Sequence, residues 1–270
     1  YLLSMVAAFV AALSPALQRF GWPHGWRPDP ARLWRLVRTN VPLAGADIAE
    51  WGARRLDIFI LGRFASAEVV GIYYVAQQIA SLPQRLKSSF DPILGPVIAR
   101  NLAAGNLAKV AGHVRQISFW VAAVQLGVVL AFGLVGKAAM GLFGPAFASG
   151  MVVMAVLLTV ELFAAQAAVA EGALIYVARG RNLVWSLVGL GVQAVLTLLL
   201  VPLDGPLGAM IGGGVGAALA LALAALLQSV VKSRLLQAKL GHAVSGWRWS
   251  LLIAGLPIIG LGLIVQRTPE

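Results

Sequence analysis

Long stretches without a charged residue recur along the chain and predict helices that cross a membrane. Such a helix needs about 20 apolar residues, because its backbone amides must bond to one another where water is absent. The charge-free stretches are 1–18, 116–136, 138–160, 182–203, 205–231 and 249–266. Two further stretches, 39–62 and 67–101, are apolar overall but contain charged residues. We therefore predict an all-α integral membrane protein with about eight membrane-crossing helices, the one from 138 continuing to about residue 178.

The composition excludes a soluble globular protein. Of the 270 residues, 60% are hydrophobic and 11% are charged, whereas soluble domains contain about 25% charged residues. The chain contains no cysteine, and its three histidines, His24, His113 and His242, lie far apart in predicted cytoplasmic loops. We therefore expect neither a disulfide framework nor a metal site.

The basic residues alternate between successive loops. The chain contains 21 Lys and Arg against 10 Asp and Glu, a net charge of +11. Basic residues near spans stay in the cytoplasm, and 14 of them fall in one set of alternate loops: Arg19, Arg27, Arg32, Arg35, Arg38, Arg100, Lys109, Arg115, Arg179, Arg181, Lys232, Arg234, Lys239 and Arg248. The other loops contain Arg63, Lys137 and Arg267. The charge therefore indicates topology and attraction to lipid head groups, and we expect no nucleic-acid partner.

A segment rich in proline and tryptophan, 21–30, predicts a linker at the membrane surface. It precedes an amphipathic stretch, 31–39. We predict four parts: a membrane-crossing helix at 1–18, a cytoplasmic linker with an amphipathic helix at 19–38, a helix bundle at 39–235, and a loop with a further membrane-crossing helix at 236–270. Because the chain opens at Tyr1 inside an apolar stretch, we expect it to be part of a longer membrane protein.

Charged residues inside the helix at 39–62 form a polar stripe. The stripe has spacings of three, four and three, which place its members on one face of a helix: Asp47, Glu50, Arg54 and Asp57. Arg55 lies about 100° away. A charge at membrane depth costs about 2.5 to 3.5 kcal/mol, so these groups must pair or meet water. The alternative is that Arg54 forms internal salt bridges with Glu50 and Asp57 that only neutralise charge.

The following helix contains a second polar stripe, with Arg85 and Lys87 beside it: Gln77, Ser81, Gln84, Ser88 and Asp91. Pro83, Pro92 and Pro96 interrupt this helix, which is tolerated where protein or a water-filled cavity covers the freed backbone groups. Two adjacent polar stripes predict a shared aqueous cavity. The alternative for the prolines is a kink that serves packing alone.

Basic side chains in such a cavity suit an anionic substrate, since guanidinium groups match phosphate oxygens. We predict the following substrate-binding residues: Arg54, Arg55, Arg85, Lys87, Gln77, Gln84 and Asp91. The remaining carboxylates could adjust the affinity, bind sugar hydroxyls, or bind a coupling proton or sodium ion: Asp47, Glu50, Asp57, Glu161 and Glu171. Glu161 and Glu171 share one broad helix face, although Glu171 could instead reach toward the head groups near Arg179 and Arg181. We expect no other cofactor.

Several short stretches together resemble the oligosaccharide-lipid flippases of the multidrug/oligosaccharidyl-lipid/polysaccharide exporter superfamily. They span most of residues 40 to 235 and comprise LDIFILGRF at 56–64, VGIYYVA at 70–76, the segment 92–99, LFGPAF at 142–147, LVP at 200–202, GAM at 208–210 and GAA at 216–218. The resemblance to the family lies in the order and spacing of these stretches along the chain and in their residue types.

The resemblance implies a fold and an activity. The chain would form the last helix of the N-lobe, a linker and most of the C-lobe of a V-shaped, two-lobed exporter in a bacterial inner membrane. Alternating access through a cationic cavity would move a polyprenyl-pyrophosphate-linked glycan from the cytoplasmic to the periplasmic leaflet, for polysaccharide or lipopolysaccharide synthesis. Arg54, Arg55, Arg85 and Lys87 would face the pyrophosphate and the glycan. Membrane lipids and polysaccharide polymerase machinery are the other expected partners.

Three other functions compete with this one. A cation-coupled multidrug antiporter of the same superfamily predicts a cavity dominated by acids. A membrane glycosyltransferase or ligase predicts a long periplasmic loop with catalytic residues, and a structural subunit leaves the polar stripes unexplained. We favour the flippase, which is a transporter and not an enzyme.

Overall fold

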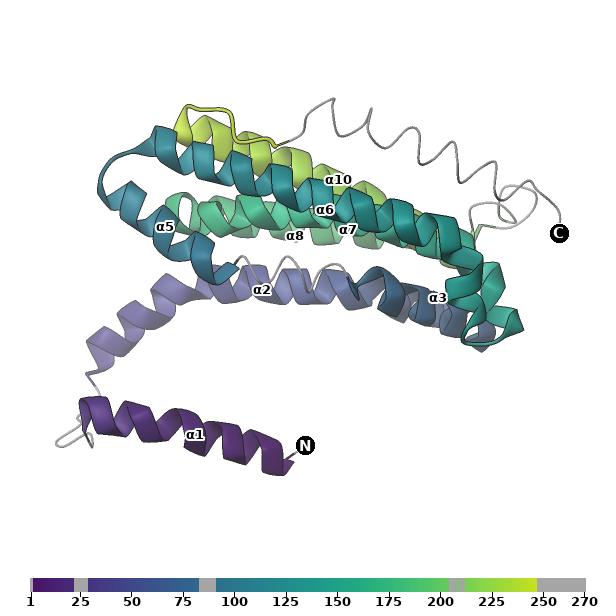
Figure 1. The fold of residues 1–270 in the computed structure, drawn as a ribbon, viewed down its shortest axis with the longest axis horizontal. Helices are drawn as coiled ribbons and strands as arrows, with labels where there is room; N and C mark the ends of the chain where they lie inside the picture. The colour runs from purple at the N-terminus through teal and green to yellow at the C-terminus, as the bar shows by residue number, and fades with distance from the viewer. Residues whose placement is uncertain (1, 22–28, 83–90, 204–207, 209–211, 247–270) are drawn as a thin grey trace. The chain divides into compact units, whose positions relative to one another are not determined.

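The computed structural model describes residues 2–21, 29–82, 91–203, 208 and 212–246. All regular structure in these residues is helical, which confirms the all-α prediction (Figure 1). The α-helices are α1 (Leu2–Phe20), α2 (Pro30–Phe64), α3 (Ala67–Ala80), α5 (Asp91–Ala103), α6 (Leu107–Gly141), α7 (Met151–Val177), α8 (Arg179–Leu200) and α10 (Gly213–Leu240). One 3-10 helix, η1 (Pro145–Gly150), precedes α7.

Five helical segments in the described part are long and apolar enough to cross a membrane: Leu3–Phe20, Leu107–Gly133, Pro145–Val177, Arg179–Leu200 and Gly213–Leu240. These segments support a multi-pass membrane protein. The predicted span at 249–266 lies outside the described residues. The other two predicted spans, 39–62 and 67–101, are not among these five segments. The helix α2 carries several charges, and α3 and α5 have only 14 and 13 residues.

Three predicted boundaries are wrong. The stretch 31–39 is not a separate linker helix, because α2 runs without a break from Pro30 to Phe64. The helix predicted to continue over 67–101 is interrupted in the described residues, because α3 ends at Ala80 and α5 covers Asp91–Ala103. The break predicted at Lys137 lies further on, because α6 continues to Gly141 and the chain turns at Gly144, whose φ of 127° favours glycine.

The chain divides into two compact units, Tyr1–Val41 and Pro42–Glu270. The smaller unit contains α1 and the first part of α2, and large apolar side chains of α1 such as Leu3 and Phe9 are exposed. In the larger unit, α7 packs against α3, α5, α6, α8 and α10. Buried residues therefore occur all around α7, as expected for a central helix.

Small residues let α10 approach its neighbours closely. Gly214, Gly216, Ala217 and Ala218 are buried on α10, and a Cβ atom at Gly214 would already contact Val153 at 3.6 Å. Small residues at helix contacts are a common way for helices to pack closely in lipid. The described residues form three buried apolar clusters: one around Met154 and Tyr73, one around Leu174 and Leu236, and a small one around Ala122 and Leu162.

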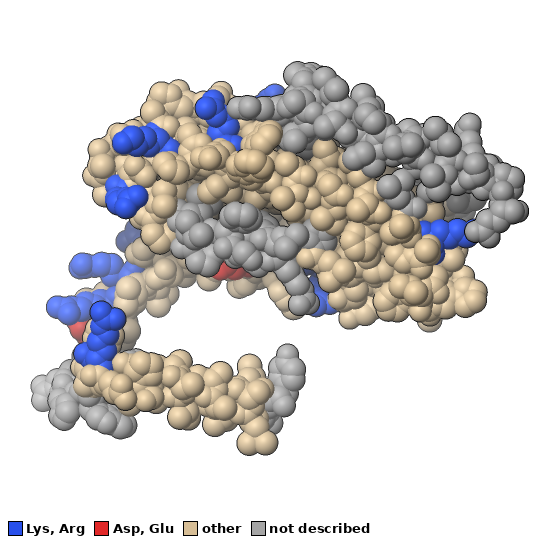
Figure 2. Space-filling view, in the orientation of Figure 1, with Lys and Arg blue, Asp and Glu red and all other residues tan. Residues whose placement is uncertain are grey.

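Basic side chains gather at one end of the larger unit. Figure 2 shows Lys and Arg over the end where α5 meets α6. The residues at these helix ends were predicted in loops, but they lie on helices that extend beyond the apolar stretches: Arg100, Lys109, His113, Arg115, Arg179, Arg181, Arg234 and Lys239. The exposed apolar side chains of α6 and α8, such as Trp120 and Leu187, suit contact with lipid.

Candidate functional site

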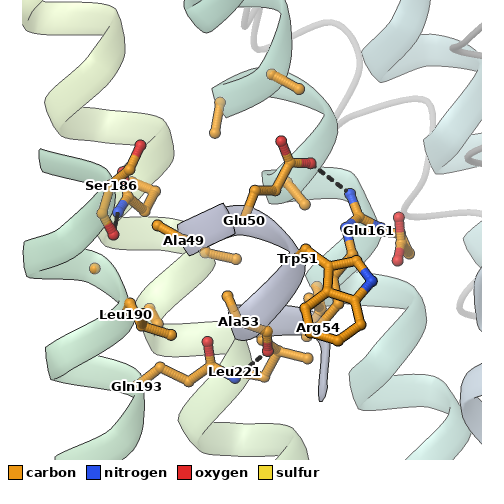
Figure 3. A pocket seen from close by; sticks show the side chains of 18 of the residues that line it. Ala49, Glu50, Trp51, Ala53, Arg54, Glu161, Ser186, Leu190, Gln193 and Leu221 are labelled. Carbon is orange, nitrogen blue, oxygen red and sulfur yellow. Dashed lines mark hydrogen bonds and ion pairs between the residues drawn. The ribbon is translucent and has the colours of Figure 1, made fainter. Parts of the chain in front are cut away.

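Five helices of the larger unit surround a cavity of about 320 Å³. The cavity lies between α2, α3, α7, α8 and α10, and Figure 3 shows it from close by. Much of its lining is too small to fill the space between the helices: Ala49, Ala53, Ala80, Ala164, Ala167, Ala168, Gly189, Ala224 and Ala225. The space therefore follows from small residues at facing positions of several helices.

Two arginines line the cavity from α2. Arg54 and Arg55 both contribute, as predicted, together with Glu50 and Trp51. Arg54 Nη2 contacts Glu50 Oε1 at 2.8 Å, and the two side chains remain 37% and 44% exposed (Figure 3). The alternative of a neutralising Glu50–Arg54 pair is therefore observed. This pair is open to solvent, so its ions remain available to a ligand.

Asp57 is not paired with Arg54, contrary to the other half of that alternative. Its side chain is fully buried, and its Oδ2 accepts hydrogen bonds from the Tyr73 hydroxyl and from Gln77 Nε2. Asp57 therefore joins α2 to α3 and is not among the lining residues.

The prediction that the stripe on α2 faces one cavity is wrong at both ends. Asp47 is exposed and is not among the lining residues either. Ten residues separate Asp47 from Asp57, and at about 100° per residue their directions differ by about 80°. Only the middle of the stripe, Glu50 and Arg54, therefore reaches the cavity.

The second stripe is described only at its start. Gln77 lines the cavity, as predicted, and Gln78 and Ser81 line it as well. Four predicted residues or their side chains lie outside the described part: Gln84, Arg85, Lys87 and the side chain of Asp91, the first residue of α5.

Both predicted glutamates of α7 line the cavity. Glu161 and Glu171 reach it from one broad face of the helix, as expected from their spacing. Glu171 Oε2 contacts Lys232 Nζ at 2.7 Å, and Asn182 Nδ2 donates to Glu171 Oε1 at 2.6 Å. The alternative that Glu171 reaches toward Arg179 and Arg181 is therefore not what the structure shows.

Lys232 was predicted in a cytoplasmic loop, and this prediction is wrong. It lies inside α10, its side chain is 6% exposed, and it lines the cavity. The apolar stretch ends at Val231, but the helix continues to Leu240. Among the described lining residues the charges balance: Arg54, Arg55 and Lys232 against Glu50, Glu161 and Glu171. The described lining is thus not the cationic one that the sequence predicted.

A polar stripe on α8 was not predicted from the sequence. The buried residues of α8 are Asn182, Ser186, Gly189, Gln193 and Thr197. Large apolar residues on the same helix, such as Leu187 and Val195, are exposed instead. Gln193 Nε2 donates to the Ala53 carbonyl at 2.6 Å and ties α8 to α2. Spacings of four, three, four and four would have revealed this stripe, had neutral residues been considered along with charged ones.

Gln228 of α10 extends over α8, and its side chain also lines the cavity. Its Nε2 donates to the Trp185 carbonyl at 2.6 Å. Gly189 makes this possible, because a Cβ atom there would overlap the Gln228 amide. The cavity thus combines ion pairs, amides and hydroxyl groups with apolar surface, an arrangement that suits a polar solute at membrane depth.

The sequence model of a family described as polysaccharide biosynthesis protein matches residues 2–130. This is just under half of the chain, and it includes the α2 and α3 walls of the cavity but not α7, α8 or α10. No curated protein and no solved structure matches the chain. The match supports the broad expectation of a protein of polysaccharide biosynthesis and export, although the resemblance noted from the sequence lay further along, mostly over 40–235.

Proposed function

We propose that this protein is a flippase that moves a polyprenyl-pyrophosphate-linked oligosaccharide from the cytoplasmic to the periplasmic leaflet of a bacterial inner membrane. The main support is a cavity lined by charged, amide and hydroxyl side chains as well as apolar ones. It is enclosed partly by three helices that are long and apolar enough to cross a membrane, α7, α8 and α10. A membrane protein needs such a cavity only if something polar passes or binds there. The match of residues 2–130 to a family of polysaccharide biosynthesis proteins supports a substrate that carries a glycan.

The α2 wall is the proposed site for the pyrophosphate. Arg54 and Arg55 lie next to each other on it, and the Arg54 side chain is 37% exposed within a solvent-accessible ion pair. In the empty site Glu50 neutralises much of the charge of Arg54. An arriving pyrophosphate then replaces Glu50 as the partner of Arg54. Alternating access then carries the head group across, and proton or sodium binding at the cavity carboxylates supplies the driving force.

Charge reversal on the α2 wall tests this proposal. The full chain is reconstituted in vesicles with a fluorescent polyprenyl-pyrophosphate-linked oligosaccharide, and an impermeant quencher reports the label in each leaflet. Arg54→Glu is expected to slow the movement at least about tenfold, because it removes a charge-assisted contact and adds repulsion. Arg63→Glu is the matched control, since Arg63 is exposed at the end of the same helix. Equal movement by the Arg54 and Arg63 variants contradicts the proposal.

The same vesicles discriminate between the competing functions. A cation-coupled multidrug antiporter is the competing transporter and predicts an excess of acids, whereas three carboxylates only balance three cations among the described lining residues. It would accumulate a fluorescent organic cation under a proton or sodium gradient and leave the oligosaccharide lipid in place. A glycosyltransferase or ligase would change the mass of the oligosaccharide lipid, whereas a flippase leaves that mass unchanged.

A further inference from the structure

Two polar atoms of the cavity lining are buried without a hydrogen-bond partner. They are Ser186 Oγ on α8 and Gln228 Oε1 on α10. Ser186 as a whole is only 7% exposed. Buried polar groups in folded proteins nearly always have a partner, so an unpaired group in a cavity wall calls for one from a ligand or from water.

The two residues belong to one local arrangement. Gln228 Nε2 donates to the Trp185 carbonyl at 2.6 Å and lies 3.5 Å from the Ser186 carbonyl. The amide nitrogen is thereby occupied by the α8 backbone, which leaves the amide oxygen as the free end of the side chain. Gly189, one turn further along α8, provides the room for this position.

This wall lies apart from the arginines of α2. Figure 3 shows Ser186 and Leu190 on one side of Ala49 and Ala53, and Arg54 with Glu161 on the other. Ala224 and Leu221 lie one and two turns before Gln228 on α10, and Leu190 follows Gly189 on α8; all three are apolar lining residues. The α8–α10 side therefore offers neutral polar atoms beside apolar surface. The nearest cation along α10, Lys232, lies one turn from Gln228 and is paired with Glu171.

The chemistry of these atoms restricts the ligand. The amide oxygen of Gln228 accepts hydrogen bonds and needs a donor, while the Ser186 hydroxyl can donate or accept. A fully ionised phosphate has no proton to donate, so it cannot satisfy Gln228. A sugar hydroxyl group both donates and accepts, and the carbon-bound faces of a sugar ring suit the apolar neighbours.

We infer that Ser186 and Gln228 form a neutral subsite for the hydroxyl groups of the glycan, opposite the arginines proposed for the pyrophosphate. This inference rests on the proposed function, because it names the part of the proposed substrate that each wall binds. Gln228 and Ser186 then contribute to recognition of the sugar and not of the lipid carrier.

Binding measurements with two probes test this subsite. The full chain in nanodiscs is titrated with polyprenyl pyrophosphate and with the same carrier bearing the oligosaccharide of the transport assay. Wild type is expected to bind the glycan-bearing carrier more tightly. Ser186→Ala and Gln228→Leu should each raise the Kd of that carrier about three- to tenfold, as for one lost hydrogen bond, and leave the Kd of the bare carrier unchanged. Gln237→Leu, an exposed glutamine on the same helix, is the control.

Two further variants separate recognition from folding. Ser186→Thr keeps the hydroxyl group and should bind like wild type. Gly189→Ala removes no polar atom but displaces the Gln228 side chain. It should therefore raise the Kd of the glycan-bearing carrier and leave the Kd of the bare carrier unchanged. The inference is overturned if wild type does not distinguish the two carriers, or if Ser186→Ala and Gln228→Leu change both Kd values equally or not at all. Failure of the proposed function is seen separately, as equal transport by the Arg54 and Arg63 variants.

Discussion

Replacing Lys232 with methionine is expected to lower the free energy of unfolding by about 3 to 5 kcal/mol. Lys232 Nζ contacts Glu171 Oε2 at 2.7 Å, and the two side chains are only 6% and 13% exposed. Methionine fills a similar volume but leaves the Glu171 carboxylate nearly buried without its cation, and a lone buried charge is far more costly than a buried pair. Titration of the full chain in detergent micelles with dodecyl sulfate measures the loss.

Two controls show whether the pair itself is responsible. Lys239→Met removes an exposed lysine from the same helix and should change the stability by less than about 0.5 kcal/mol. The double variant Glu171→Gln with Lys232→Met should recover most of the loss, because it removes both charges and keeps an acceptor for Asn182. If the single and double variants are equally unstable, an unpaired charge is not the cause.

The pair also fixes one end of the cavity. Glu171 comes from α7, Lys232 from α10 and Asn182 from α8, so one carboxylate connects three helices. A nearly buried lysine is tolerated here because the Glu171 carboxylate is its partner. We therefore expect Lys232→Met to loosen the α7, α8 and α10 walls together.

The Asp57→Ala variant is expected to lose about 3 kcal/mol of stability. Asp57 accepts hydrogen bonds from Tyr73 and Gln77, and both Asp57 and Tyr73 are fully buried. Alanine leaves the Tyr73 hydroxyl without a partner and opens a small void, and each effect costs about 1 to 3 kcal/mol. The lost hydrogen bond from Gln77 costs less free energy, because the Gln77 side chain also lines the cavity. The same dodecyl sulfate titration measures the change.

Asp47→Ala is the matched control for this prediction, since Asp47 is an exposed aspartate on the same helix. It should change the stability by less than about 0.5 kcal/mol. Tyr73→Phe should have an intermediate effect, because the Asp57 carboxylate still accepts hydrogen bonds from Gln77 Nε2 at 3.1 Å and from the Ile58 N–H at 2.8 Å. Equal stability of the Asp57 and Asp47 variants would show that the link between α2 and α3 contributes little.

The amino-acid pattern by itself determined the class of protein. Long apolar stretches in lipid are satisfied as helices. Within the described residues, the spans predicted at 116–136, 182–203 and 205–231 coincide with α6, α8 and α10, although the observed helices have other ends. It also placed Arg54, Arg55, Gln77, Glu161 and Glu171 on faces that reach one cavity, because helical spacing fixes which side chains share a face.

Tertiary structure alone decided which polar groups are partners. Lys232 was read as a loop residue, since an apolar stretch ends before it, but packing of α10 against α7 buries it beside Glu171. Asp57 belongs to the same sequence stripe as Arg54 yet bonds Tyr73 of another helix. Likewise, Ser186 and Gln228 lie 42 residues apart and meet only because Gly189 lets α10 approach α8. Periodicity gives the direction of a side chain around its own helix, whereas its partner depends on which helix packs there.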